Sequence, residues 1–238
     1  MIGEKEKTKI TRSAVAACIT WFLFHFLAFY LPQIIISTFG IERQIVHDFI
    51  DIPFIPQGFT LIYVLAYIQW FLNAYVLLRE RDNKLLYKFF AIDAVGKIIA
   101  AIIFTAWPTQ MIQPDTLNPA LFDQKDFWIF HLNILYSLDD PVNLFPSIHC
   151  FESLVDAVVV CQAKKTSKAF KIGSVIFTLF VFASTVFTKQ HILIDIPGGV
   201  LLFVIMYFTI PKTSIPDKLE KLFTKLDKKP NEKVSSSV

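Results

Sequence analysis

Charged residues are scarce in this chain of 238 residues, where Asp, Glu, Lys and Arg together make up 18%. A soluble domain of this length usually carries about 25% charged residues. Apolar types reach 54%, 25 residues are Phe, and the mean hydropathy is +0.52. Six membrane spans of roughly 20 residues each would absorb most of this apolar content. The composition therefore excludes an ordinary soluble globule.

Cysteine is also rare, and the three that occur are Cys18, Cys150 and Cys161. The number is odd, and Cys18 and Cys161 fall within apolar segments, so the sequence implies no disulfide framework. The chain also lacks a small-residue cleavage site after its first apolar run, which extends to Ile36 and is too long for the core of a signal peptide. We therefore expect this run to remain as the first membrane span.

Apolar segments recur along the chain, and we expect six of them to cross a membrane. They run over residues 14–36, 59–78, 89–107, 147–163, 170–187 and 192–210. Lipid offers no hydrogen bonds to the backbone, and the alternating ten-residue strands of a barrel are missing, so the predicted fold class is an all-α helical bundle. The membrane domain, residues 14–211, is expected between a cytoplasmic segment, residues 1–13, and a basic cytoplasmic tail, residues 212–238.

The Lys and Arg residues are distributed unequally between the two sides of the expected bundle. Of the 23 Lys and Arg residues, 19 lie before the first segment, in the second and fourth connections, or after the sixth segment. The positive-inside rule places that side, with both termini, in the cytoplasm. We expect an integral protein of the plasma membrane with its chemistry at the outer face. The basic tail favours an orientation signal or contact with anionic lipids, and no nucleic-acid partner.

Two histidines lie at the outer ends of neighbouring segments. The run Pro146-Ser147-Ile148-His149 opens the fourth segment, and His191 precedes the sixth, with Asp195 four residues later. Segments four and five form one hairpin, so both histidines lie at the same membrane face. On a helix, Asp195 and His191 would share one side, and the carboxylate would leave one imidazole nitrogen free as base or nucleophile.

The start of the fourth segment suits an anion. Pro146 has no N–H to leave unsatisfied in the first turn of a helix. The free N–H groups of such a helix start, together with the Ser147 hydroxyl, form an anion-binding end. The two histidines and this helix start together predict a phosphate site.

The pattern Pro-Ser-x-His followed by Ser-x6-His-x3-Asp resembles the second and third motifs of the type 2 phosphatidic acid phosphatase superfamily, the lipid phosphate phosphatases related to vanadium haloperoxidases. In this chain the two motifs are residues 146–149 and 184–195. The neighbouring residues 140–149 and Lys189-Gln190-His191 are similar to a branch that includes inositol phosphorylceramide synthases. The resemblance covers roughly residues 48–202 and implies six spans, a site at the outer leaflet, and no metal or other cofactor.

The resemblance also implies residue roles. His191 would be the nucleophile that forms a phosphohistidine, Asp195 would orient it, and His149 would protonate the leaving oxygen. The phosphoryl oxygens would be held by Ser147, Ser184 and nearby backbone N–H groups such as that of Ile148. The partner implied is a lipid phosphate that reaches the site between spans, and the reaction is that of a phosphatase or a lipid phosphotransferase.

Three cations of the family pattern are replaced here. Its first motif, Lys-x6-Arg-Pro, falls on residues 106–114, where Ala106 stands for the lysine and Gln113 for the arginine, and Thr185 replaces the arginine of the third motif. Each cation would make a charge-assisted phosphate contact of about 1.5–3 kcal/mol. We expect Lys189 to bind phosphate in their place, with Gln113 as a neutral donor.

Two other classes of function stay open. His149, Glu152, His191 and Asp195 are possible ligands of a zinc-like ion, which would make the protein an intramembrane metal-dependent enzyme. A family member without its motif cations could instead serve as a scaffold or transporter, with Pro197-Gly198-Gly199 either as a mobile element or as a site of kinking and close helix packing.

The remaining polar groups within the apolar segments suggest structural roles. His25, His47 and His131 belong to no motif and are interpreted as satisfied core residues. Asp93 and Lys97 form an i, i+4 pair, and we expect Lys97 to contact Asp93 or Asp156, since ionised groups in lipid need partners. Glu152 is expected close enough to His149 to tune it.

Overall fold

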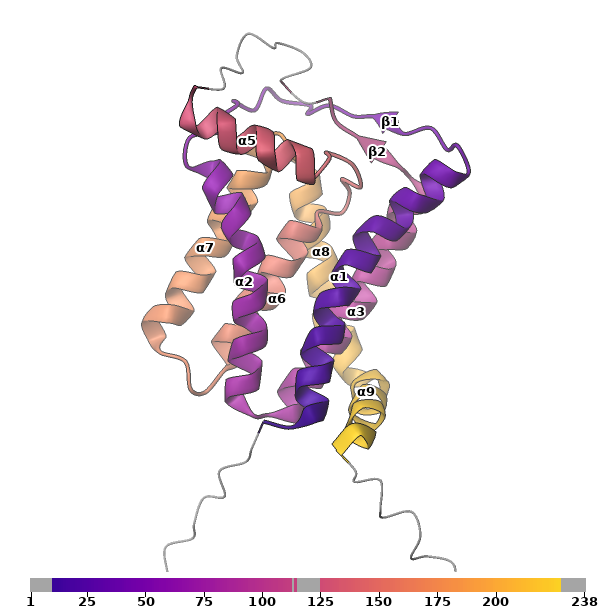
Figure 1. The fold of residues 1–238 in the computed structure, drawn as a ribbon, viewed down its shortest axis with the longest axis vertical. Coiled ribbons are helices and arrows are strands. Elements are labelled where there is room, and N and C mark those ends of the chain that lie inside the picture. The colour runs from indigo at the N-terminus through magenta and orange to yellow at the C-terminus, as the bar shows by residue number, and fades with distance from the viewer. Residues whose placement is uncertain (1–9, 113, 115–124, 228–238) are drawn as a thin grey trace, which may run out of the picture.

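The computed structural model describes residues 10–112, 114 and 125–227, and it is a helical bundle (Figure 1). The five longest helices are α1 (Arg12–Thr38), α2 (Phe59–Glu80), α3 (Asn83–Ala106), α7 (Lys168–Phe187) and α8 (Asp195–Thr209). Shorter elements are α5 (Phe127–Leu138), α6 (Ile148–Gln162), α9 (Ile215–Phe223) and the 3-10 turns η2 (Ile210–Lys212) and η3 (Thr224–Asp227). Among the described residues the strands are β1 (Gln44–Ile45) and β2 (Thr109–Gln110), which pair in parallel. The predicted all-α class is confirmed.

Five helices of the described chain are long and apolar enough to cross a membrane: α1, α2, α3, α7, and α8 continued through η2. This indicates an integral membrane protein. The fourth predicted span forms α6, which has 15 residues and packs against α2, α3, α7 and α8. Five of the six predicted spans are therefore helices long and apolar enough to cross a membrane, and the sixth crossing, by α6, stays a prediction.

The core of the bundle forms where α6 meets α3 and α8. Phe151 is fully buried, and its ring lies where a Cβ at Gly96 of α3 would stand, so the absent side chain lets the two helices approach closely. Val155 and Val159 follow Phe151 along the same buried stripe of α6. The same helix buries Glu152 and Asp156, and their charges therefore lie inside the bundle.

Among the six predicted segments only α2 begins at its predicted residue, and α1 and α7 each begin two residues early. α3 begins at Asn83, six residues before the predicted start, because the side chain of Asp82 accepts a hydrogen bond from the Leu85 N–H at 3.1 Å and caps the helix. α8 begins at Asp195, three residues after the predicted start. α6 is capped by Ser147, whose Oγ accepts from the Cys150 N–H at 3.3 Å, so Pro146 precedes the cap, and its predicted place in the first turn is wrong.

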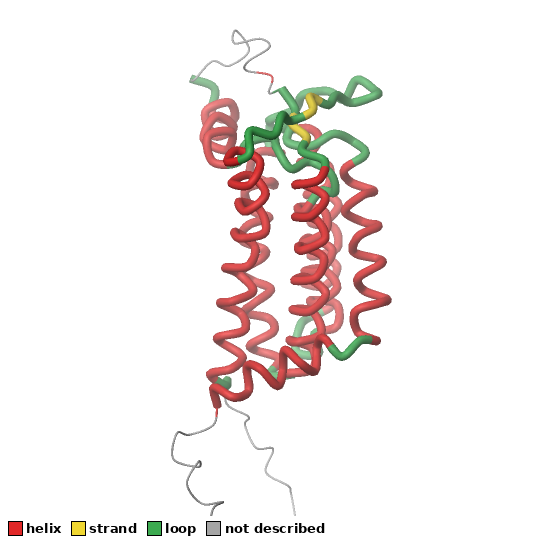
Figure 2. Tube along the Cα trace, turned by 90° about the vertical axis from the view of Figure 1, so that its right-hand side faces the viewer, coloured by secondary structure: helices red, strands yellow, loops and turns green. Residues whose placement is uncertain are grey.

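The two ends of the bundle differ in character. One end holds the start of α1, the α2–α3 and α6–α7 connections and η3, and the Ser13 N–H donates to Asp227 Oδ1 there at 3.0 Å. At the other end α5 lies across the bundle, and β1 and β2 lie there too (Figures 1 and 2). Both histidine motifs belong to the α5 end, because α6 and α8 start there.

Candidate active site

A cavity of about 440 Å³ opens at the α5 end of the bundle, between α1, α2 and α5. His149 and His191 both line it, and their ring centroids are 5.8 Å apart. Apolar side chains form much of the remaining wall, including Phe26, Phe29, Val64, Ile134 and Leu138. The cavity therefore joins two histidines to a surface that suits a hydrocarbon chain.

His191 lies in the turn between α7 and α8 and not within a helix as predicted. The chain turns there because Lys189 has a φ of +56° and the N–H groups of Gln190 and His191 both donate to the Thr185 carbonyl at 3.0 Å. His191 Nδ1 is 3.0 Å from Asp195 Oδ2, which also accepts from the Ile192 N–H at 3.0 Å. Because the carboxylate accepts, Nδ1 donates, and Nε2 carries the lone pair that a nucleophile needs.

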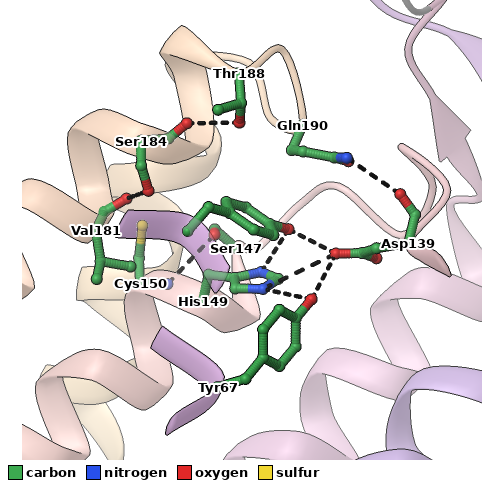
Figure 3. Close-up of polar contacts among 10 residues, drawn as sticks. Tyr67, Asp139, Ser147, His149, Cys150, Val181, Ser184, Thr188 and Gln190 are labelled. Atoms are coloured by element: carbon green, nitrogen blue, oxygen red, sulfur yellow. Dashed lines mark hydrogen bonds and ion pairs between the residues drawn. The ribbon is translucent and has the colours of Figure 1, made fainter. Parts of the chain in front are cut away.

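His149 lies in the first turn of α6 within a cluster of hydroxyl groups. Asp139 Oδ2 accepts the O–H of Tyr63 at 2.7 Å. It also accepts the O–H of Tyr67 at 2.8 Å (Figure 3). The same two hydroxyl oxygens lie 3.3 Å from His149 Nδ1 and Nε2, respectively. Each tyrosine has given its one hydrogen to Asp139, so its oxygen can only accept from His149. Both bonds form only if both ring nitrogens donate, and the cluster thus fits an imidazolium at His149.

Asp139 supplies the opposite charge for this imidazolium. Its Oδ2 is 4.0 Å from His149 Nε2, and the residue is 8% exposed. Burial raises the pKa of the Asp139 carboxyl, while the hydrogen bonds from Tyr63 and Tyr67 act in the opposite direction. On acidification the carboxylate is therefore lost at a higher pH than for an ordinary aspartate, near 4. If activity requires the Asp139 carboxylate, the pH–rate profile falls on its acid side at a pH above about 4, the usual pKa of an aspartate.

The starts of α6 and α8 are joined by a hydrogen bond and pack closely. The Ser147 N–H donates to the Asp195 carbonyl at 3.1 Å, and a Cβ at Gly199 would collide with the Ser147 carbonyl oxygen. The N–H groups of Ile148 and His149 have no acceptor within the described part of the chain. These two donors lie where the sequence predicts an anion-binding end, and the binding of an anion there stays a prediction.

We expect Gly199→Ala to disrupt this contact. The added methyl group meets backbone atoms of α6, which cannot rotate away, so the variant loses about 1–3 kcal/mol of stability through overpacking. A lower midpoint of thermal unfolding in detergent, with reduced activity, is the expected result. Gly173→Ala is the matched control, because an added Cβ there meets no atom within 4 Å. Equal midpoints for the two variants would contradict the close packing.

Of the four predicted phosphate ligands that the structure describes, one lines the cavity and three do not. Ile148 lines the cavity, but Ser147, Ser184 and Lys189 do not. Ser147 Oγ caps α6, and Ser184 Oγ donates to the Val181 carbonyl at 2.7 Å (Figure 3). Lys189 Nζ donates to the Ile52 carbonyl at 2.5 Å and holds the segment before α2 instead of facing the cavity. Gln113 lies outside the described residues.

Sequence reasoning missed four residues of the site: Tyr63, Tyr67, Asp139 and Gln190, all of which line the cavity. Gln190 Nε2 donates to the Asp139 carbonyl at 3.1 Å and ties the His191 turn to the end of α5 (Figure 3). Tyr63 and Tyr67 are spaced i, i+4 in the second apolar segment, so their hydroxyls share one face of α2. That spacing was the available signal.

The metal alternative does not fit the observed placement. Within the described residues no three His, Cys, Asp or Glu side chains are grouped so that they could hold a metal ion. Glu152 belongs to the proposed ligand set but contacts His25 Nδ1 at 3.0 Å and Lys97. Glu152 lies one turn from His149 on α6, so its expected influence on that histidine acts through its charge and not through a direct contact.

A family model described as PAP2 superfamily matches residues 37–209. The chain belongs to the PAP2 superfamily. The match includes α6, the His191 turn and all of α8, and thus both His149 and His191. No curated protein and no solved structure matches the chain. Membership of the PAP2 superfamily supports a phosphatase-like function, and the similarity to the inositol phosphorylceramide synthase branch stays a prediction.

Proposed function

We propose that this protein is a membrane phosphatase or phosphotransferase that acts on a lipid-linked phosphate through a covalent phosphohistidine at His191. The observation that carries the proposal is the pair of histidines on one cavity wall with different partners. Asp195 accepts from Nδ1 of His191, whereas two tyrosine hydroxyls surround His149. One histidine is thereby equipped as a nucleophile and the other as a proton donor.

The reaction follows from the different protonation states of His191 and His149. Nε2 of His191 attacks phosphorus, the bond from phosphorus to the leaving oxygen breaks, and that oxygen takes a proton from a ring N–H of His149. In the second half, water or an alcohol gives its proton to the now neutral His149 and attacks the phosphohistidine, which releases Nε2. The free N–H groups of Ile148 and His149 support the phosphoryl oxygens at the start of α6.

A lipid substrate has a route into this cavity from the side of the bundle. Phe26 and Tyr30 of α1 and Val64 of α2 line the cavity and are also exposed on the flank of the bundle, by 44%, 45% and 41%. These helices contact each other little, and in Figure 1 they diverge toward the α5 end. An apolar tail can therefore stay in the bilayer while the phosphate reaches the histidines.

We expect Val64→Trp to narrow this route. The variant should lower kcat/KM for a long-chain lipid phosphate about tenfold or more, because the indole obstructs the flank opening. Turnover of water-soluble p-nitrophenyl phosphate should change much less, since that substrate needs no lateral entry. Leu61→Trp is the matched control, because Leu61 is also exposed on α2 but does not line the cavity. An equal loss for both substrates would contradict lateral entry.

We further propose that the α5 end faces outward and that both termini are cytoplasmic. At the opposite end, the last turn of α2 carries Arg79, and the α2–α3 and α6–α7 connections carry Arg81, Lys164 and Lys165, as the positive-inside rule requires of a cytoplasmic face. Labelling of single cysteines at the two ends of the bundle with a membrane-impermeant reagent on intact cells tests this orientation. Labelling only at the α6–α7 connection would reverse it.

The reaction itself is tested by phosphate release from a panel of lipid phosphates, with the purified full chain in detergent. The proposal predicts turnover of at least one member of the panel. Absence of turnover across phosphatidic acid, phosphatidylglycerophosphate and polyprenyl diphosphate would favour the scaffold or transporter alternative.

A further inference from the structure

A connected group of ionisable side chains lies beside the catalytic cavity. Lys97 Nζ on α3 is 2.8 Å from Asp93 Oδ2 and also contacts Glu152 Oε1 of α6. The same Glu152 oxygen is 3.0 Å from Nδ1 of His25 on α1. Lys97 therefore pairs with Asp93, one of its two predicted partners, and with Glu152 instead of Asp156.

This group of buried side chains holds more carboxyl groups than basic groups. Asp156 lies one turn beyond Glu152 on α6 and is 1% exposed, and its Oδ2 has no hydrogen-bond partner within the described residues. Three carboxyl groups thus surround one lysine. With one carboxyl protonated, one negative charge in excess of Lys97 remains in the bundle interior, where such charge is costly, and a second proton balances it. His25 is one of the groups that can take this second proton, because its Nδ1 contacts Glu152.

His25 also lies at the junction of two cavities. It lines the catalytic cavity and, alone among the residues of that wall, a second cavity of about 240 Å³ that reaches Lys97, Glu152 and Asp156. Its ring centroid is 4.1 Å from that of Trp70, which in turn is 5.7 Å from that of His149. With Nδ1 on Glu152, the other ring nitrogen, Nε2, makes no hydrogen bond in the described part of the protein.

The catalytic cavity lacks the cations that a phosphate dianion needs. Across residues 10–112, 114 and 125–227, no Lys or Arg side chain lines it. Ala106 and Thr185 occupy two of the family's cation positions, and Lys189 is directed to Ile52. The histidines of the wall are the groups that remain able to carry positive charge.

We propose that His25 is a phosphate-binding cation of this site, held between Glu152 and the substrate. When the phosphate enters, Nε2 takes up a proton from solvent or from the monoanionic phosphate and donates it in a hydrogen bond to a phosphoryl oxygen. Glu152 accepts from Nδ1 throughout and stabilises the imidazolium. The inference rests on the proposed function, because it names a group that holds the phosphate of the same reaction.

The charge of His25 depends on the titratable groups around it. These are Tyr63 and Tyr67 on α2, Asp93 and Lys97 on α3, His149, Glu152 and Asp156 on α6, His131 on α5, Asp139, Asp140 and His191 in the connections, and Cys18 and Tyr30 on α1 itself. Glu152 is the group in direct contact, so it is the one whose neutralisation most weakens the imidazolium.

Binding of orthovanadate to the full chain in detergent, measured by calorimetry between pH 5.5 and 9, tests this inference. We expect His25→Gln to weaken binding at least about tenfold at low pH, as for loss of a charge-assisted hydrogen bond. The ratio of variant to wild-type Kd cancels the ionisation of vanadate itself. That ratio should fall toward one at high pH, where His25 stays neutral in the wild type. Glu152→Gln should move this fall to lower pH.

The outcomes separate a charge role from a structural one. His47→Gln is the matched control, since His47 is exposed outside both cavities, and its Kd should equal that of the wild type. A ratio for His25→Gln that is one at every pH, or that is raised but independent of pH, would overturn the inference. Wild-type vanadate binding with the expected pH dependence, but without lipid phosphate turnover, would support His25 and contradict the proposed function.

Discussion

Replacement of His191 by alanine is expected to lower kcat for phosphate release from lipid phosphates at least about a thousandfold. In the proposed reaction Nε2 of His191 attacks phosphorus, and the buried carboxylate of Asp195 orients its ring through Nδ1. Without it no covalent intermediate forms, and residual turnover depends on the remaining charge and positioning. Initial rates of purified wild type and variant at saturating substrate measure the loss.

His47→Ala provides the control for this experiment, since it removes an imidazole from an exposed position outside the cavity. Its rates should match those of the wild type. Retained binding of vanadate by His25 and the α6 helix start, measured on the His191→Ala protein, would show that the cavity still forms. Equal turnover by wild type and His191→Ala would exclude His191 as the nucleophile.

Asp139→Asn is expected to lower kcat about a hundredfold on lipid phosphates, within the usual contribution of a general acid. The amide carries no charge, so even when its oxygen accepts the two tyrosine hydrogens it does not stabilise an imidazolium at His149. The neutral imidazole is then favoured, and the proton that the leaving oxygen needs is lost. The acid limb that Asp139 sets in the wild type should disappear as well, because the variant has no carboxyl to protonate.

The leaving group makes this prediction specific. p-Nitrophenolate departs without a proton, so Asp139→Asn should cost far less with p-nitrophenyl phosphate than with an alkyl phosphate. The double variant Tyr63→Phe, Tyr67→Phe should show the same substrate dependence, because it removes the oxygens that face His149. Asp51→Asn, at an exposed position, is the control. An equal loss for both substrates would mean that Asp139 positions the phosphate or the fold and not the proton.

Local sequence patterns predicted much of the fold and the centre of the site. Long apolar runs have few alternatives to helices in lipid, so the positions of α1, α2 and α7 followed from composition. The contact of His191 with Asp195 followed from their separation of four residues. The structure makes that contact across a turn and not along a helix, because Thr185 accepts two N–H groups and delays the start of α8.

The remaining parts of the site depend on contacts between distant segments, which spacing does not show. Tyr63 and Asp139 are 76 residues apart, and His25 and Glu152 are 127 apart. The first pair forms because α5 packs against α2, and the second because Glu152 of α6 faces His25 of α1. Lys189 was predicted to bind phosphate from its position near His191, but its positive φ directs the chain so that Nζ reaches Ile52.

The central claim is the covalent intermediate, and trapping it is the most direct test. Purified wild-type protein is mixed with a lipid phosphate carrying a radioactive phosphoryl group and quenched in alkali within one turnover, since phosphohistidine resists alkali and decays in acid. We predict label on the peptide that contains His191, and none in His191→Ala. Label on another residue, or turnover by the wild type without any labelled protein, would contradict the mechanism.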